Sequence, residues 1–102
     1  MKRPVIWTQD ALDELRQQTE FIALNNPDAA RRVADRIRDA ANALGDTPTG
    51  RPGRVAGTYE KSLGRPPYIL VYALKRTGDR ETVVIVHLIH TARNWPAGGW
   101  PQ

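Results

Sequence analysis

The sequence predicts an α+β fold, in which an N-terminal strand and an antiparallel helical hairpin pack on a twisted, mainly antiparallel sheet that ends in a three-stranded meander. Two observations predict it. Residues 8–45 carry two helical apolar patterns separated by a break, and residues 54–89 hold three strand-like segments on short connections. The 102 residues suffice for one domain. We expect that domain to span residues 1–96, with residues 97–102 as a C-terminal tail.

The helical half starts with a short strand at residues 3–7, where Pro4 favours an edge position. Thr8 is the expected N-cap of the first helix. Its predicted buried face comprises Leu12, Leu15, Thr19, Ile22 and Ala23. Asn26 followed by Pro27 starts a second helix, which Gly45 is expected to end in a left-handed conformation. The apolar face of that helix comprises Ala30, Val33, Ile37, Ala40, Ala41 and Leu44.

The sheet half follows a loop rich in proline and glycine at residues 46–53. Strands are predicted within residues 54–63, at the apolar run 68–74, and at 82–89 after a hairpin turn. Tyr68 and Tyr72 share one face of the middle strand, which favours core packing over base stacking. Simple alternation places His87 on the same face as Ile85 and Ile89.

Charge and composition narrow the function classes. The chain has a net charge of +4, with seven basic and eight acidic residues in 1–46 but eight basic and three acidic in 47–102. Such asymmetry favours a phosphate-bearing or acidic partner. With no cysteine and two histidines, we expect no disulfide, no metal site and no cofactor. No apolar run reaches about 20 residues, so we expect a cytoplasmic protein without a membrane partner.

One constellation could carry chemistry. The common nucleophile, phosphate-loop and zinc-protease motifs are absent from the sequence. Strand ends in a meander converge, so His90, Arg93, Lys61 and Arg65 could form a cationic pocket that cleaves RNA without a metal. His90 would transfer protons, and Arg93 or Lys61 would stabilise the phosphorane. A structural role for His90, in which it hydrogen-bonds to backbone at the strand end, is favoured over this one.

Several segments in order carry a family resemblance. They are Gly57-Thr58-Tyr59-Glu60, the run 67–72, the run 83–86 and the ending His90-x-x-Arg93-x-Trp95-Pro96. Their order and spacing resemble the RelE/ParE toxin superfamily of bacterial type II toxin–antitoxin modules, and the ending points to the ParE side. The resemblance implies a small toxin held inactive by an antitoxin encoded beside it.

The superfamily implies two alternative targets. ParE-type members poison DNA gyrase and block replication, whereas RelE-type members are ribosome-dependent mRNA ribonucleases. Lys61, Arg65 and Arg93 match part of the ribonuclease set, but no tyrosine follows residue 72, and Tyr59 stands where many relatives carry arginine. We therefore expect a gyrase-binding toxin that is not itself an enzyme. Its candidate target contacts are Arg93, Trp95 and Trp100. The alternatives are an mRNA endoribonuclease and a degenerate, non-toxic binding module.

The expected partner is a cognate acidic antitoxin, ParD-like, forming a hetero-oligomer. An amphipathic antitoxin helix could occupy an apolar groove on the helical hairpin. Its candidate contacts are Leu12, Leu15, Ile22 and Val33. Acidic antitoxin side chains would meet basic residues of the second half. Those candidates are Arg54, Lys61, Arg65 and Arg76. The alternative is that packing against the sheet already buries the apolar residues.

Overall fold

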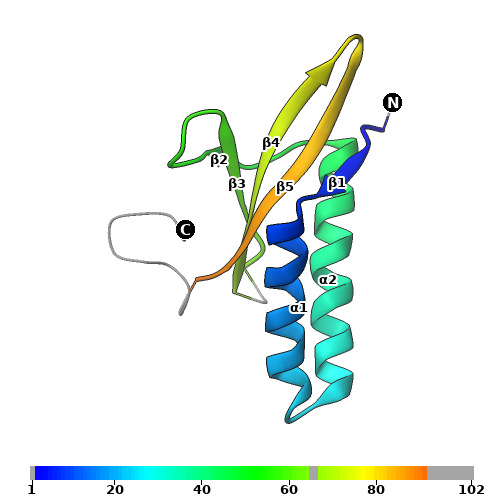
Figure 1. The fold of residues 1–102 in the computed structure, drawn as a ribbon, viewed down its shortest axis with the longest axis vertical. Coiled ribbons are helices and arrows are strands. Elements are labelled where there is room, and N and C mark those ends of the chain that lie inside the picture. The colour runs from blue at the N-terminus through cyan, green and yellow to red at the C-terminus, as the bar shows by residue number, and fades with distance from the viewer. Residues whose placement is uncertain (1, 65–66, 92–102) are drawn as a thin grey trace.

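The computed structural model describes residues 2–64 and 67–91. The elements run in the order β1 (Val5–Trp7), α1 (Gln9–Ala23), α2 (Pro27–Asp46), β2 (Arg51–Pro52), β3 (Thr58–Ser62), β4 (Tyr68–Thr77) and β5 (Arg80–His90). The five strands form one sheet in the order β1-β5-β4-β3-β2 (Figure 1). β1 runs parallel to β5, and all other pairs are antiparallel. The predicted α+β fold and its three-stranded meander are confirmed.

Both helix starts follow from their capping residues. The Thr8 hydroxyl accepts a hydrogen bond from the Ala11 backbone N–H at 3.1 Å, and the Asn26 side chain accepts one from Ala29 at 3.0 Å. Each cap satisfies one of the N–H groups that a helix start leaves without a partner. Pro27 occupies the first turn, where its missing N–H costs nothing. The predicted starts are confirmed. No helix of the described ranges is both long and apolar enough to cross a membrane.

The predicted end of the second helix is wrong. α2 continues to Asp46, and Gly45 is a buried helical residue rather than a left-handed cap. A Cβ at position 45 would lie 2.6 Å from the backbone oxygen of Arg3, which is too close for any side chain. The Arg3 backbone N–H also donates to the Gly45 oxygen at 2.8 Å. The glycine is needed there because the N-terminal segment passes directly against the helix.

The buried face of α1 lies next to the one that the sequence predicted. Ala11, Leu15 and Gln18 are buried, whereas the side chain of Leu12 is 44% exposed. Gln18 belongs to this face because its side-chain oxygen accepts a hydrogen bond from the Tyr68 hydroxyl at 3.3 Å. The face of α2 is as expected. Its buried residues include Ala30, Ile37, Ala41 and Leu44, with Val33 and Ala40 packed partly against the core.

The sheet contains an irregularity that changes which residues share a face. Tyr72 pairs with Ile85, but its neighbour Val71 pairs with His87, so Val86 is an extra residue on β5. Such a bulge resets the alternation of side chains. His87 and Ile89 therefore share one face, while Ile85 lies in the core on the other. The prediction that His87 shares the face of Ile85 is wrong for this reason.

Candidate functional site

A groove lies between α2 and β3. The helices pack over β1 and β5, which leaves the β3 side of the same sheet face without a helix (Figure 1). The resulting groove has a volume of about 460 Å³. Its walls come from α2, the segment after it, and β3; the lining includes Arg36, Ala40, Ala43, Leu44, Lys61 and Leu63. We call this the α2–β3 groove.

The α2–β3 groove combines an apolar base with basic residues. Leu44 and Leu63 are buried, and the short side chains of Ala40 and Ala43 leave space along the α2 wall. Arg36 and Lys61 contribute positive charge from opposite walls, against one carboxylate, that of Asp46. Neither basic side chain has an ion pair within the described residues. An amphipathic segment with acidic side chains matches this arrangement.

A second, shallower groove lies on the helical hairpin itself. It has a volume of about 340 Å³, and small residues line it, among them Ala23, Ala30 and Ala34. Two of the residues that we expected to line a hairpin groove are not available there. Leu15 is in the core, and Val33 packs partly against it. Ile22 is half-buried, and Leu12 is exposed. The hairpin groove is therefore built from alanines rather than from the predicted larger side chains.

The predicted basic residues do not gather into one patch. Lys61 lies in β3 opposite Leu70, whereas Arg76 lies six residues further along β4, which corresponds to about 20 Å. Arg54 is exposed in the loop between β2 and β3. Arg65 lies outside the described residues. Of the three candidates that the structure describes, only Lys61 lines the α2–β3 groove.

Of the four candidate ribonuclease residues, the structure describes His90 and Lys61. His90 pairs with Tyr68, and their rings meet edge to face with centroids 5.1 Å apart. Lys61 lies on the other side of β4 from His90, because β4 separates β3 from β5. Arg93, and with it the target candidates Trp95 and Trp100, lies outside the described residues. Within residues 2–64 and 67–91, no three acidic or histidine side chains gather as metal ligands would.

Two carboxylates hold the sheet in ways that the sequence did not reveal. Glu14 of α1 accepts a hydrogen bond from the Leu88 backbone N–H at 2.9 Å, and lies 3.1 Å from Nδ1 of His87. Glu60 of β3 is only 4% exposed and accepts a hydrogen bond from the Arg54 backbone N–H at 3.1 Å. Both stand at positions where the apolar pattern predicts polar residues, so no sequence signal distinguishes them from solvated carboxylates.

Tyr72 joins the sheet to the segment that follows α2. Its buried ring stacks on Tyr59 with centroids 5.5 Å apart, and its hydroxyl donates a hydrogen bond to the Thr49 backbone oxygen. Burial, with a smaller contribution from Tyr59, raises the pKa of Tyr72 above the ordinary value of 10.0. The folded state therefore holds this proton more tightly than the unfolded state does.

Tyr72→Phe tests that hydrogen bond. We expect the substitution to lower the free energy of unfolding by about 1 kcal/mol at neutral pH, because the Thr49 oxygen loses its donor. Since the raised pKa favours the protonated folded state, Tyr72 contributes stability that is complete below pH 10.0 and declines as the pH rises above it. Urea unfolding from pH 8 to about pH 11 should show a shallower alkaline loss in the variant. Equal alkaline losses in both proteins would contradict this account.

The comparisons with known proteins identify the class. Residues 5–95 match the family described as "ParE toxin of type II toxin-antitoxin system, parDE". The chain is 38% identical over 96 residues to "Putative toxin Y4kP" of Sinorhizobium fredii, covering 93% of this chain and 95% of that protein. It is 34% identical over 90 residues to "Toxin RelE2" of Caulobacter vibrioides, covering 87% and 96%.

Solved structures show the same fold. The structure described as "Chromosomal ParDE TA system from P. aeruginosa" matches with a TM-score of 0.77 at 20% identity, over 87% of this chain and 96% of the other. "YoeB/ParE toxin from Agrobacterium tumefaciens" matches with a TM-score of 0.57 at 18% identity, over 85% and 96%. The fold is that of the RelE/ParE toxin superfamily. Within it, this chain belongs to the ParE toxin family of type II toxin–antitoxin systems.

Proposed function

We propose that this protein is a cytoplasmic ParE-type toxin that inhibits DNA gyrase, and that a cognate ParD-like antitoxin neutralises it. The observation that carries the proposal is the family match over residues 5–95, which spans nearly the whole chain. Relatives named toxins at 34% and 38% identity support it. In this proposal the toxin acts by binding and not by its own chemistry, and its target contacts are Arg93, Trp95 and Trp100.

The α2–β3 groove is the proposed antitoxin site. The P. aeruginosa relative of the same fold is described as part of a ParDE system. In this chain the groove offers an apolar base at Leu44 and Leu63, with Arg36 and Lys61 on its two walls. An acidic, amphipathic antitoxin segment would bury its apolar face on the base and pair its carboxylates with the two cations. The groove on the helical hairpin would take a second, helical part of the antitoxin.

Induction in bacterial cells tests the proposed function. Expression of the chain without its antitoxin should stop growth with filamentation and DNA-damage signalling, because trapped or inactive gyrase blocks replication. Co-expression of the open reading frame adjacent to the toxin gene, when it encodes a short acidic protein, should restore growth. The readouts are colony counts, cell length and a DNA-damage reporter. Growth arrest without DNA-damage signalling would contradict gyrase as the target.

A second candidate is a ribosome-dependent mRNA endoribonuclease. The Caulobacter relative is named RelE2, and Lys61 at the groove edge matches part of the set that such enzymes use. This candidate predicts mRNA cut in the ribosomal A site after induction, and loss of that cleavage in both Lys61→Ala and His90→Ala. Intact mRNA during growth arrest would remove it. Co-purification with the antitoxin in the absence of any growth phenotype would instead favour a degenerate binding module.

A further inference from the structure

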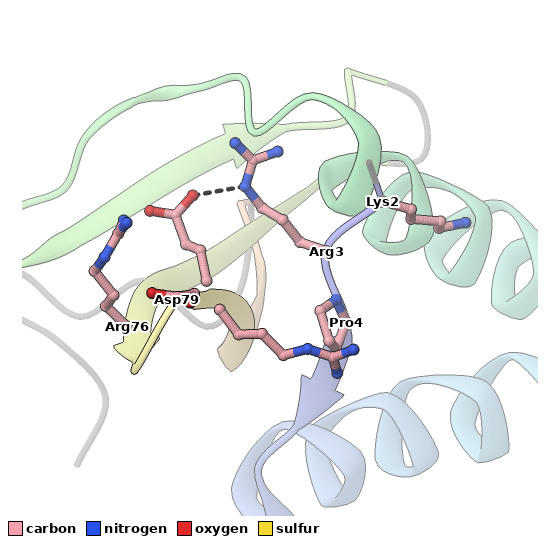
Figure 2. Close-up of a pocket in the computed structure, with 7 residues that line it drawn as sticks. Lys2, Arg3, Pro4, Arg76 and Asp79 are labelled. Atoms are coloured by element: carbon pink, nitrogen blue, oxygen red, sulfur yellow. Dashed lines mark hydrogen bonds and ion pairs between the residues drawn. The ribbon is translucent and has the colours of Figure 1, made fainter.

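A basic cavity, distinct from the α2–β3 groove, lies where the N-terminal segment passes the β4–β5 hairpin. The two sites are joined by one contact, because Arg3 of this cavity donates from Nη1 to the backbone oxygen of Asp46, which lines the groove, at 3.4 Å. The cavity has a volume of about 280 Å³, and Figure 2 shows Arg3, Pro4, Arg76 and Asp79 around it, with Lys2 at its rim. Arg80 and Glu81 also line it. The α2–β3 groove proposed for the antitoxin does not include the cavity residues, although Arg76 is one of the basic side chains that the sequence analysis expected an antitoxin to meet.

The topology builds this cavity at the end of a two-stranded ribbon. The last pair between β3 and β4 is Thr58 with Ala73, so from residue 74 onward β5 is the only strand of the described residues that pairs with β4. On the other side, β1 begins opposite Val83. Figure 1 shows the β4–β5 hairpin projecting beyond the rest of the sheet. The N-terminal segment is fixed beside it by a hydrogen bond from the Val83 backbone N–H to the Pro4 oxygen at 2.9 Å.

Most of the net charge of the protein is concentrated at this end. Five basic residues lie on the N-terminal segment and the ribbon, namely Lys2, Arg3, Lys75, Arg76 and Arg80. Against them stand Asp79 and Glu81, which leaves a local net charge of +3 out of +4 for the whole chain. Arg3 pairs with Glu81, with 2.6 Å between Nε and Oε1 (Figure 2).

The remaining guanidinium groups are available to a ligand. Arg76 and Arg80 are exposed and make no hydrogen bond or ion pair within the described part of the chain. Arg3 is already engaged, by Glu81 through Nε and by the Asp46 backbone oxygen through Nη1, and so contributes charge more than free donors. Planar guanidinium groups bind phosphate oxygens in bidentate fashion, so Arg76 and Arg80 beside one cavity form a site suited to phosphate.

We propose that this ribbon tip binds the sugar–phosphate backbone of a nucleic acid. Among the described residues, Pro4 is the one apolar residue that lines the cavity. An acidic protein would need apolar anchors to bind stably, whereas non-specific nucleic-acid binding depends almost entirely on cations. A two-stranded ribbon also fits the major groove of duplex DNA, where its tip cations meet phosphates. The proposal does not rest on gyrase or on the ribosome as the target.

The test is fluorescence anisotropy with a labelled 20-base-pair DNA duplex and, separately, a single-stranded RNA of the same length. At about 50 mM NaCl, Arg76→Ala combined with Arg80→Ala should weaken binding at least about tenfold, and should reduce the slope of log affinity against log salt by about 2. The matched control is Arg32→Ala combined with Arg38→Ala, two exposed arginines of α2 that also remove two charges. The control should bind like the parent protein.

Each outcome decides the proposal. A loss of affinity confined to the Arg76/Arg80 variant supports it. The probe that the parent protein binds more tightly shows whether DNA or RNA is the preferred ligand. Equal losses of affinity in the Arg76/Arg80 variant and in the control would show that overall charge attracts the nucleic acid, and would overturn the site. Failure of the parent protein to bind either the DNA or the RNA would also overturn it. Binding of polyglutamate as tight as that of the duplex, and equally sensitive to Arg76 and Arg80, would assign the cavity to an acidic protein instead. Circular dichroism spectra and melting temperatures should match across all variants, because all four substituted side chains are exposed.

Discussion

Leu15→Glu should unfold the protein or remove at least about 4 kcal/mol of its stability. Leu15 is 4% exposed and belongs to the core cluster between α1 and the sheet. A carboxylate in that position would lose its water and gain no partner, and the cost of such burial is a large part of the total stability of a small domain. The measurement is urea unfolding followed by circular dichroism, with the melting temperature as a second readout.

Leu12→Glu is the matched control on the same helix. Its side chain is 44% exposed, so we expect a change within about 1 kcal/mol. A stable Leu15→Glu protein would contradict the described packing. The folded Leu12→Glu variant also answers a question about partners: antitoxin affinity should be unchanged if the antitoxin occupies the α2–β3 groove, and should fall if it covers the outer face of α1.

Reversing the charge of the basic side chain on each wall of the α2–β3 groove should weaken antitoxin binding at least about tenfold, and more strongly at low salt. Arg36→Glu with Lys61→Glu replaces two attractive charges by two repulsive ones beside an acidic partner. The loss should come mostly from slower association, since charges at the rim of an interface mainly steer encounter. Biolayer interferometry with the immobilised antitoxin separates the two rate constants.

The control for this experiment carries the same charge change elsewhere. Arg32→Glu with Arg38→Glu alters two exposed positions of α2 that do not line the groove. We expect this control to keep most of the affinity. If the control loses as much antitoxin affinity as the groove variant, long-range attraction between the charges of the two proteins explains the binding, and the groove assignment is wrong. If neither variant loses affinity, the antitoxin docks on another surface, with the groove on the helical hairpin as the next candidate.

Local sequence signals predicted the parts of this fold that depend on neighbouring residues. Thr8 and Asn26 cap their helices as expected, because a capping side chain acts within its own turn. Tyr68 and Tyr72 lie in the core as their spacing in the apolar run indicates. The strand order in the meander also follows from short connections, which leave little choice of neighbour.

Other features depend on contacts between distant segments, and sequence pattern alone misses them. Gly45 looks like a helix end, but its role is to give room to Arg3, which lies 42 residues earlier in the chain and passes directly against it. The extra residue Val86 arises from pairing with β4, and nothing in the β5 sequence marks it. Gln18 is buried because Tyr68 offers it a hydrogen bond, although a helical pattern read alone makes it a surface residue.

The candidate site was predicted less well than the fold. The basic residues of the second half are close in sequence, but a strand rises about 3.3 Å per residue, so Lys61 and Arg76 lie at different ends of the sheet. Arg3 and Arg80 were not singled out, since their proximity depends on the parallel pairing of β1 with β5. The mix of apolar base and basic walls in the α2–β3 groove depends on where the helices lie over the sheet.

The most direct test of the central claim is a supercoiling assay with purified components. Purified toxin is added to DNA gyrase, relaxed plasmid and ATP, with the toxin–antitoxin complex as the matched control. The account predicts that free toxin inhibits supercoiling or traps cleaved plasmid, and that the complex has no effect. Undiminished supercoiling at a large molar excess of folded toxin, together with mRNA cut in the ribosomal A site in a translation assay, would contradict it.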